Sequence, residues 1–328
     1  MGSSYGLPFH WYRLYSWLDS RSGILEVLFC QTDTMNQENK IHLLVGLGEL
    51  LWDLLPSGPQ LGGAPANFAY HAQALGGRAS VVSCIGTDDW GQRTVTQLNT
   101  SGLDTACVAT DVDAPTGTVT VTLDEQGKPV YTIHEDVAWD RIAWTDVLAG
   151  LAASCDAVCF GSLAQRSEQS RQTIQRFLSQ THPQCLRVFD INLRQSYYDA
   201  DCIDTSLTHA NVFKLSDEEV SATAACLQMS ANEDAFLDEV LKRYNLQLIA
   251  LTRGAEGSRL KTPTQDREQK SLSVQVTDTV GAGDAFTAAL ALGLLKRQNL
   301  ETIHTNATKL AGYVCSQTGA MPAYNDEV

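Results

Sequence analysis

Hydrophobic residues come in short continuous runs along most of the chain, and the runs are separated by glycines or polar clusters. The first run, IHLLVGLGELLWDLLP at residues 41–56, begins unbroken, which is typical of a strand buried in a parallel sheet, and continues as a partly exposed strand. Similar runs predict strands in RASVVSCIG (78–86), DTACVAT (104–110), DAVCFGS (156–162), CLRVFDIN (185–192), NVFKLS (211–216) and LQLIALT (246–252).

Helix-forming segments lie between these runs. GGAPANFAYHAQALGG, residues 62–77, predicts a helix because Pro65 stands at its start, alanines fill it and two glycines end it. Further helices are predicted in DDWGQRTVTQLNTSG (88–102), SEQSRQTIQRFLSQ (167–180) and NEDAFLDEVLKRYN (232–245). The alternation of strand and helix predicts an α/β fold with a mainly parallel sheet covered on both faces.

One segment breaks this rhythm. TGTVTVTLDEQGKPVYTIHED, residues 116–136, alternates strictly and carries a turn at 124–129, so it predicts an antiparallel hairpin with two different faces. Such a hairpin inside an α/β protein needs something to cover. The polar stretch KTPTQDREQKS, residues 261–271, predicts a loop.

Composition and charge exclude some classes of partner. The chain has 328 residues, 44% hydrophobic residues and a net charge of -15, with no cluster of Lys and Arg, which argues against a nucleic-acid or anionic-membrane surface. No apolar run reaches the roughly 18 residues of a membrane span. The nine cysteines are scattered without a CxxC pair, which favours buried thiols and a reducing cytoplasm.

Residues 1–34 do not share the pattern of the remainder. MGSS resembles the start of an expression tag, and LEVLFCQ resembles a viral 3C protease site with an inserted cysteine. We therefore expect residues 1–34 to be a non-native leader and the domain to occupy residues 35–328.

The richest candidate for chemistry is DTVGAGDAF, residues 278–286, which precedes the apolar run TAALALGLL. The amides of Ala282, Gly283 and Asp284 are predicted at a helix start, where free donors and the helix dipole favour an anion such as a phosphoryl group. Asp284 could accept the proton of an attacking hydroxyl, or it could only cap the helix. A carboxylate at a helix start is expected to stay ionised at neutral pH.

Other nucleotide and hydrolase motifs are incomplete or missing from the sequence. Gly46 and Gly48 follow the first strand but lack the third glycine of a dinucleotide fingerprint. The sequence has no G-x-x-x-x-G-K-[ST] and no G-x-S-x-G. His71, in the alanine-rich helix, is expected to be a packing or surface residue.

From about residue 41 to residue 322, the chain resembles the PfkB (ribokinase-like) carbohydrate kinases. GGAPANFAYHAQALGG resembles the N-terminal signature of the family, DTVGAGDAFTAAL the C-terminal signature, and LTRGAEGS a further segment. Within the family the resemblance is closest to bacterial fructokinases, through GELLWDLLPSGPQLGGAPANFAYHA, PTGTVTVTLDEQGKPVYTIHEDVAWD and FDINLRQSYY. It implies a three-layer α/β/α fold with a mainly parallel central sheet, and a small β-sheet lid from about residues 49–61 and 116–135.

The resemblance also implies roles for the residues at matching positions. Asp284 matches the catalytic base, Gly281, Ala282 and Gly283 the anion hole, and Asp53, Gly62, Gly63 and Asn67 the sugar site. Arg194 matches an arginine near the phosphates, Thr252, Gly254, Gly257 and Asn306 the nucleotide site, and Asp278 and Thr279 the loop that binds a monovalent cation.

The chain departs from the family in one motif. The family often carries Asn-x-x-Glu where this chain has SDEE, so that Ser216 replaces the asparagine and Glu219 keeps the acid. The motif helps to organise Mg²⁺ and phosphate in the family, whereas SDEEV is also a good capping sequence for a helix. The sequence leaves both roles of Glu219 open, in the organisation of Mg²⁺ and phosphate or in helix capping.

The activity implied by the resemblance is ATP-dependent phosphorylation of a sugar hydroxyl, with fructose the expected substrate and fructose 6-phosphate the product. ATP, Mg²⁺ and K⁺ are the expected cofactors, and a homodimer joined through the hairpin is the expected assembly. The alternatives within the family are a ribokinase, a 2-keto-3-deoxygluconate kinase and an aminoimidazole riboside kinase. Outside it, the alternatives are a non-catalytic sugar-binding regulator and, more distantly, a dehydrogenase.

Overall fold

The computed structural model describes residues 40–56, 58–123 and 129–324, and the elements below belong to the unit formed by residues Ile41–Val328. The leader expected at residues 1–34 lies outside the described residues.

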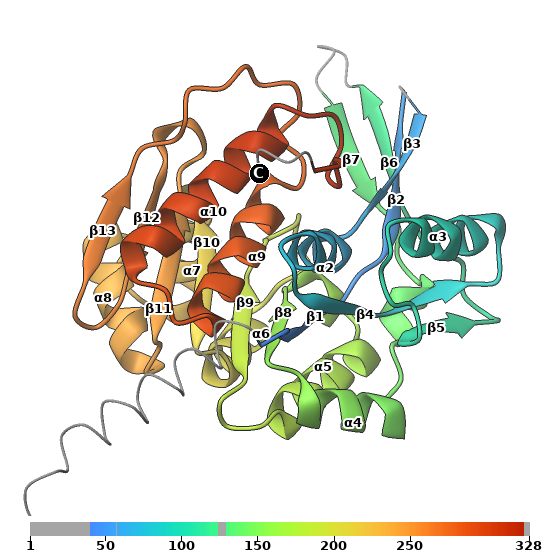
Figure 1. The fold of residues 1–328 in the computed structure, drawn as a ribbon. Coiled ribbons are helices and arrows are strands. Elements are labelled where there is room, and N and C mark those ends of the chain that lie inside the picture. Colours follow the sequence, from blue (N-terminus) through green and yellow to red (C-terminus); the bar gives the residue numbers. More distant parts are fainter. Residues whose placement is uncertain (1–39, 57, 124–128, 325–328) are drawn as a thin grey trace, which may run out of the picture. The chain divides into compact units, whose positions relative to one another are not determined.

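Among the described residues, the main sheet has nine strands in the order β13-β12-β11-β10-β9-β8-β1-β4-β5 (Figure 1). They are β1 (Leu43–Leu47), β4 (Arg78–Gly86), β5 (Val108–Asp111), β8 (Ala157–Phe160), β9 (Leu186–Asp190), β10 (Val212–Ser216), β11 (Leu248–Thr252), β12 (Ser258–Lys261) and β13 (Asp266–Gln269). The strands from β11 to β5 run parallel, and β12 pairs antiparallel with both β11 and β13.

Strand β13 corrects one prediction, since residues 261–271 were expected to form a loop. Its residues pair with β12 through the backbone and carry charged side chains that join neighbouring elements, as in the ion pairs of Asp266 with Arg259 (2.7 Å) and of Arg267 with Glu301 (3.0 Å). An edge strand of this kind buries little apolar surface, so its sequence lacks the alternation that marks a half-buried strand.

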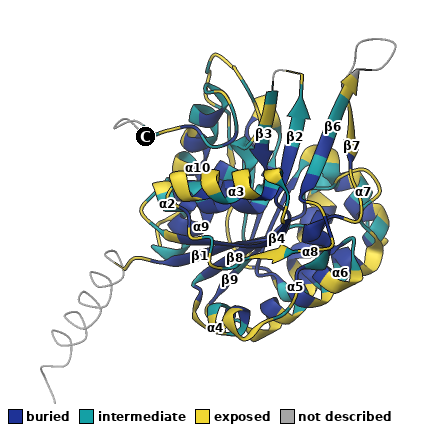
Figure 2. Cartoon of the chain, turned by 90° about the vertical axis from the view of Figure 1, so that its right-hand side faces the viewer, coloured by how far each residue is buried: buried dark blue, intermediate teal, exposed yellow. Residues whose placement is uncertain are grey.

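The sheet has one hydrophobic core on each face. In β1, Leu43, Val45 and Leu47 pack into one core and Leu44 packs into the other, as the alternation of side chains along a strand requires. Helices α2 (Ala64–Ala74), α3 (Asp89–Thr100), α9 (Ala282–Leu295) and α10 (Leu300–Cys315) contribute to the core that contains Leu44. Helices α4 (Asp146–Ser154), α5 (Glu168–Gln180), α6 (Ala200–His209), α7 (Asp217–Leu227) and α8 (Glu233–Arg243) contribute to the other. The predicted three-layer α/β/α fold is therefore confirmed (Figure 2).

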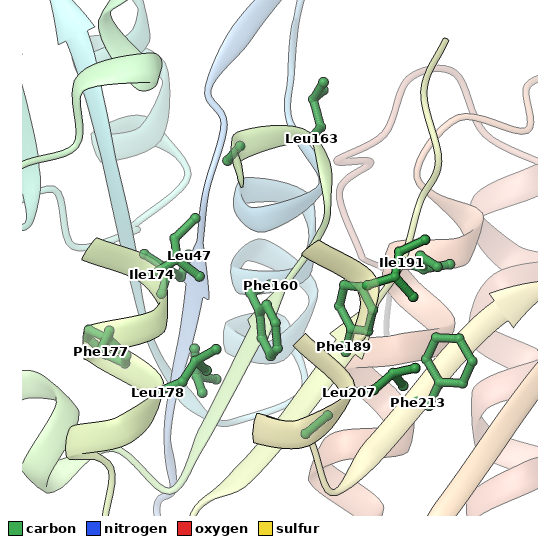
Figure 3. Packing of buried hydrophobic residues seen from close by; sticks show 14 of the residues in the cluster. Leu47, Phe160, Leu163, Ile174, Phe177, Leu178, Phe189, Ile191, Leu207 and Phe213 are labelled. Atoms are coloured by element: carbon green, nitrogen blue, oxygen red, sulfur yellow. The ribbon is translucent and has the colours of Figure 1, made fainter. Parts of the chain in front are cut away.

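Three phenylalanines connect the middle strands of the sheet within the core that contains Val45. Phe160, Phe189 and Phe213 come from the adjacent strands β8, β9 and β10, with ring centroids 5.2 and 5.7 Å apart between neighbours (Figure 3). All three are fully buried, and the rings of each neighbouring pair are close to parallel. Phe189 and Phe213 directly precede Asp190 and Lys214, so the stack lies one residue before these two charged side chains of the candidate site.

A second, smaller sheet stands apart from the first, with the strand order β3-β2-β6-β7 (Figure 1). Its strands are β2 (Leu51–Leu55), β3 (Gly58–Gly62), β6 (Gly117–Leu123) and β7 (Pro129–Ile133). Strands β6 and β7 form the predicted antiparallel hairpin, whose turn at residues 124–128 lies outside the described residues. Strand β2 pairs parallel to β6, so the two chain segments form one mixed sheet.

The base of the small sheet is fixed to the main body by Trp52 of β2. Its indole Nε1 donates a hydrogen bond to Thr94 Oγ1 of α3 (2.9 Å), and the guanidinium of Arg93 lies 4.6 Å from the ring centroid. Val119 and Ile133, which face each other across the hairpin, are also buried in the core that contains Val45.

The remaining regular elements are 3₁₀ turns at Ala138–Arg141, Leu163–Gln165 and Gly254–Glu256. Within the described ranges, no helix is long and apolar enough to span a bilayer.

Candidate active site

The candidate site begins at the first turn of α9. Gly281 precedes the helix with a φ of 80°, a left-handed conformation that suits glycine, and Asp284 stands in the first turn. Among the described residues, the side chain of Asp284 accepts a hydrogen bond at Oδ2 from Asn67 Nδ2 of α2 (2.8 Å). The side chain is thus held across the gap between two helices, an arrangement that favours the catalytic alternative over the capping one.

The environment of Asp284 corrects a second expectation, that the helix start would keep this carboxylate fully ionised. Burial, followed by the charge of Asp190, raises the pKa of Asp284 to about 7, although the hydrogen bond from Asn67 and the charge of Lys214 act in the opposite direction. The loss of hydration therefore outweighs the neighbouring groups that favour the ionised form. A carboxyl group with this pKa is well suited to accept a proton near neutral pH.

A buried ion pair lies beside the same turn of α9. Lys214 Nζ, from the middle of β10, is 2.9 Å from Oδ1 of Asp190, which ends β9 and pairs with Lys214 in the sheet. Asp190 Oδ2 accepts a hydrogen bond from Thr287 Oγ1 of α9 (3.0 Å). A Cβ on Gly283 would lie 3.1 Å from Lys214 Nζ, so the ammonium group lies directly against the turn. Neither residue was predicted as a site residue, although a lysine inside the apolar run NVFKLS was a signal of a buried charge.

On the side of the small sheet, the residues expected at the sugar site come together. A Cβ on Gly62 would be 2.7 Å from Asp53 Oδ2, so glycine leaves room for this carboxylate, whose pKa is raised by burial. Gly63 precedes α2 with a φ of 116°, and a Cβ there would be 2.4 Å from the carbonyl oxygen of Glu49. Asn67 Oδ1 is buried without a hydrogen-bond partner among the described residues and can accept from a ligand.

Glu49, which the sequence analysis did not select as a site residue, lies in the same region. Only 3% of the residue is exposed, and its Oε2 has no partner within the part of the chain that the structure describes. Burial raises the pKa of Glu49 to about 7, and the charge of Asp284 acts in the same direction. A glutamate directly after the buried run that ends at Gly48 was the available signal.

Arg194 occupies an exposed loop after β9, and the loop is anchored at several points. Glu219 accepts hydrogen bonds from Leu193 N at Oε1 (2.6 Å) and from Ser216 N at Oε2 (2.7 Å), while Gln195 Nε2 donates to Tyr131 O of β7 (2.7 Å). The carboxylate of Glu219 is therefore engaged by two backbone amides, in agreement with the capping alternative. The charge of Arg194 lowers the pKa of Asp53 against the larger effect of burial, which places the guanidinium on the sugar side.

A cavity of about 740 Å³ lies on the other side of the first turn of α9. Thr252, Gly254 and Gly257, all expected at the nucleotide site, line it together with Ala282 and Gly283. A Cβ on Gly257 would be 2.0 Å from Gln269 O, so only glycine fits this wall of the cavity.

Asn306, expected near the nucleotide, does not line the cavity; it is exposed on α10. The residues of α10 that line the cavity share one helical face and are Thr308, Ala311, Gly312 and Cys315. Asn306 precedes Thr308 by two residues, a separation that places it on another face of the helix. This position gives no support for a contact between Asn306 and a ligand in the cavity.

The expected cation loop is built around Asp278. Its Oδ1 accepts a hydrogen bond from Val280 N (3.0 Å) and its Oδ2 one from Gly319 N (3.1 Å), so the carboxylate joins two loops. Thr279 lines the cavity, and its carbonyl oxygen accepts from Ala282 N (3.3 Å). Among the described residues, no three His, Cys, Asp or Glu side chains converge as a metal-binding group.

Comparison with known proteins decides the family. Residues 59–327 match the pfkB family carbohydrate kinase domain. The chain belongs to this family. A fructokinase of Salmonella typhimurium is 33% identical over 261 residues, which cover 76% of this chain and 83% of the relative. A fructokinase of Escherichia coli is 31% identical, with the same coverage of both chains.

Solved structures agree with this assignment. An uncharacterized sugar kinase from Pyrococcus horikoshii is 28% identical, with a TM-score of 0.74 over 85% of this chain and 93% of that chain. A fructokinase from Xylella fastidiosa with bound ATP has a TM-score of 0.76 over 86% of this chain and 94% of that chain; at 22% identity it shows the fold alone. The protein is a PfkB sugar kinase, a phosphotransferase that acts on a sugar hydroxyl, and the family and fold predicted from the sequence are confirmed.

The raised pKa of Asp284 leads to a prediction for stability. The folded protein holds this proton up to about pH 7, whereas the ordinary pKa of the group is 3.8, so an ionised Asp284 increasingly destabilises the fold as the pH rises between these values. Asparagine is neutral throughout. We therefore expect Asp284→Asn to increase the melting temperature relative to wild type by more at pH 8 than at pH 5. Thermal unfolding at both pH values checks this, with the exposed Asp113→Asn as a control for the loss of one negative charge. An Asp284→Asn difference that is equal at the two pH values contradicts the raised pKa.

Proposed function

We propose that this kinase transfers the γ-phosphoryl group of ATP to fructose and forms fructose 6-phosphate. The observation that supports this most directly is the position of Asp284. Its carboxylate is held by Asn67 on the sugar side, while the adjacent Gly283 lines the cavity on the other side of the turn. A base at this junction can meet a sugar hydroxyl and a terminal phosphate together. The choice of fructose is supported by the relatives named fructokinase, at 33% and 31% identity.

In the proposed reaction, Asp53 and the free Oδ1 of Asn67 accept hydrogen bonds from sugar hydroxyls and orient the sugar. The reacting hydroxyl donates its proton to Asp284 as its oxygen forms a bond to the γ-phosphorus, and the bond from that phosphorus to the bridging oxygen of ADP breaks. The amides of Gly283 and Asp284 at the helix start are the proposed anion hole, with Gly281 as its turn. The amide of Ala282, expected in the same group, already donates to Thr279 O (3.3 Å) and would join the hole only by exchanging this bond for one to the phosphate. Lys214 adds a fixed positive charge beside that turn.

The residues of the site fit a Mg²⁺ ion that arrives with the nucleotide. Magnesium keeps several waters and is usually held by one or two carboxylates together with substrate phosphates, so a complete protein cage is not required. Because both oxygens of Glu219 already accept from backbone amides, we propose that Glu219 contacts the ion through water. When bound, Mg²⁺ would neutralise charge on the phosphates.

We propose that K⁺ binds in the loop of Asp278 and Thr279, next to the anion hole. The Asp278 carboxylate is used to join two loops, so backbone carbonyl oxygens are the donors available to the ion. The proposal is supported by the direct connection from Thr279 O to Ala282 N, through which an ordered loop would order the turn of α9.

We also propose a homodimer joined through the small sheet. Val121 and Tyr131 pair with each other and continue the face on which Val119 and Ile133 are buried, but Tyr131 is 53% exposed. An exposed aromatic residue on this apolar face is suited to a partner chain. Light scattering at micromolar concentration is expected to give the dimer mass for wild type and the monomer mass for Tyr131→Asp; a monomeric wild type contradicts the proposal.

The role of Asp284 as the base predicts a kinetic effect. Asp284→Asn is expected to lower kcat by about 10²–10⁴-fold, the usual range for a positioned acid–base group. KM for sugar and ATP is expected to change much less, because Asp53 and the anion hole remain. Steady-state kinetics check this, with Asp113→Asn as the matched control. A folded Asp284→Asn variant that turns over within a factor of a few of wild type would favour a non-catalytic, regulatory role.

The substrate is tested by a coupled ADP-release assay with fructose, ribose, 2-keto-3-deoxygluconate and aminoimidazole riboside. We expect fructose to give the highest kcat/KM, activity to require Mg²⁺, and added K⁺ to increase the rate. A higher kcat/KM for another sugar contradicts the substrate but leaves the kinase assignment intact. Equal rates with and without K⁺ contradict the proposed cation loop.

A further inference from the structure

His71 of α2 connects the candidate site to the C-terminal part of the described chain. The residue is completely buried, and both ring nitrogens have partners. Nε2 lies 2.9 Å from the carbonyl oxygen of Ala320, and Nδ1 lies 2.5 Å from the hydroxyl of Tyr324. The expectation that His71 only packs or lies on the surface therefore leaves out these two polar contacts.

The partners of His71 determine its tautomer. A carbonyl oxygen can only accept, so Nε2 carries the hydrogen and donates it to Ala320 O. In the neutral ring Nδ1 then accepts from the hydroxyl of Tyr324. Burial lowers the pKa of His71 to about 4, so the ring is neutral at the pH at which Asp284 titrates. The hydrogen bond from His71 to Ala320 thus has a fixed direction.

Ala320 in turn lies against the turn that precedes α9. A Cβ placed on Gly281 would be 2.7 Å from each of the Cα, Cβ and carbonyl oxygen of Ala320. Gly281 has a φ of 80°, and this glycine turn directs the following amides into the first turn of α9. A displacement of Ala320 would therefore change the space available to the turn of the proposed anion hole.

The same face of α2 holds the proposed base. Asn67 and His71 are four residues apart, a separation that places side chains one above the other along a helix. Asn67 donates to Asp284, and His71 donates to the segment that packs on Gly281. One face of α2 thus contacts the carboxylate of Asp284 directly and, through Ala320, the turn at Gly281 three residues earlier.

We propose that His71 is a positioning residue for phosphoryl transfer, which holds Ala320 against Gly281 and so fixes the anion-binding turn of α9. The proposal rests on the proposed roles of Asp284 and of the anion hole. It predicts that loss of the bond from Nε2 reduces kcat, because the turn stabilises charge in the transition state, and leaves substrate affinity nearly unchanged.

Two substitutions at residue 71 separate the two ring contacts. His71→Asn places a polar group near the position of Nδ1 and removes the donor to Ala320. His71→Gln places an amide near the position of Nε2 and can restore that donor. The matched control is Tyr313→Phe, which removes a different hydrogen bond of the same segment, from Tyr313 to Ala323 O (2.6 Å). Each variant is measured for kcat, KM for ATP and sugar, and melting temperature.

We expect His71→Asn to lower kcat by about 10- to 100-fold, the scale of a small displacement in an active site, with KM values within about threefold of wild type. His71→Gln is expected to recover most of the rate, and Tyr313→Phe to keep it. If His71→Asn retains the rate of Tyr313→Phe, or if His71→Gln is as slow as His71→Asn, the proposal is wrong.

Ala320→Gly tests the same connection if His71→Asn does not fold. It removes the methyl group that packs on Gly281 and leaves the carbonyl held by His71, and we expect kcat to fall by about tenfold. An unchanged kcat for this variant would overturn the proposal. Failure of the proposed function is recognised separately, because Asp284→Asn would then retain activity whatever the result at residue 71.

Discussion

The buried ion pair of Lys214 and Asp190 is the interaction on which the arrangement of the site depends. Two charges removed from water on adjacent strands are costly unless each compensates the other and further hydrogen bonds satisfy their remaining polar atoms. Here Thr287 supplies such a bond, and it ties the pair to α9. Because Lys214 also offsets the charge of Asp284, one ammonium group permits a second carboxylate to lie in the same poorly hydrated region. Loss of either member would leave an uncompensated charge directly under the first turn of the helix.

Geometry of the parallel sheet explains why residues far apart in the chain meet there. Strands β1, β9 and β10 end at the same edge, which brings Glu49, Asp190 and Lys214 close to the starts of α2 and α9. The glycines at these helix starts then allow backbone and side chains to approach within the distances that a Cβ would prevent. The sugar side and the cavity lined by Gly283 are separated by a single helical turn, and this turn carries Asp284.

Much of this architecture was predictable because each buried strand carries a continuous apolar run and the hairpin alternates strictly. The signature motifs selected Asp284 and Asn67, which the fold brings within hydrogen-bonding distance. Prediction failed where a property depends on neighbours remote in sequence. The pKa of Asp284 depends on burial and on Asp190, ninety-four residues earlier in the chain, and the partner of Lys214 is on another strand. Likewise, the side of α10 that meets the cavity, and hence the absence of Asn306 from its wall, depends on how α10 packs against α9.

The charged edge strand β13 has a consequence for the behaviour of the protein in concentrated solution. An open sheet exposes unpaired backbone groups at its outer strands, and these can template pairing with the sheet of another molecule. Asp266 and Arg267 place opposite charges along β13 and engage Arg259 and Glu301 in ion pairs, so that a foreign strand would meet hydrated charges. The polar sequence of β13 made this strand hard to predict from its hydrophobic pattern. The same sequence protects this edge of the main sheet from edge-to-edge aggregation.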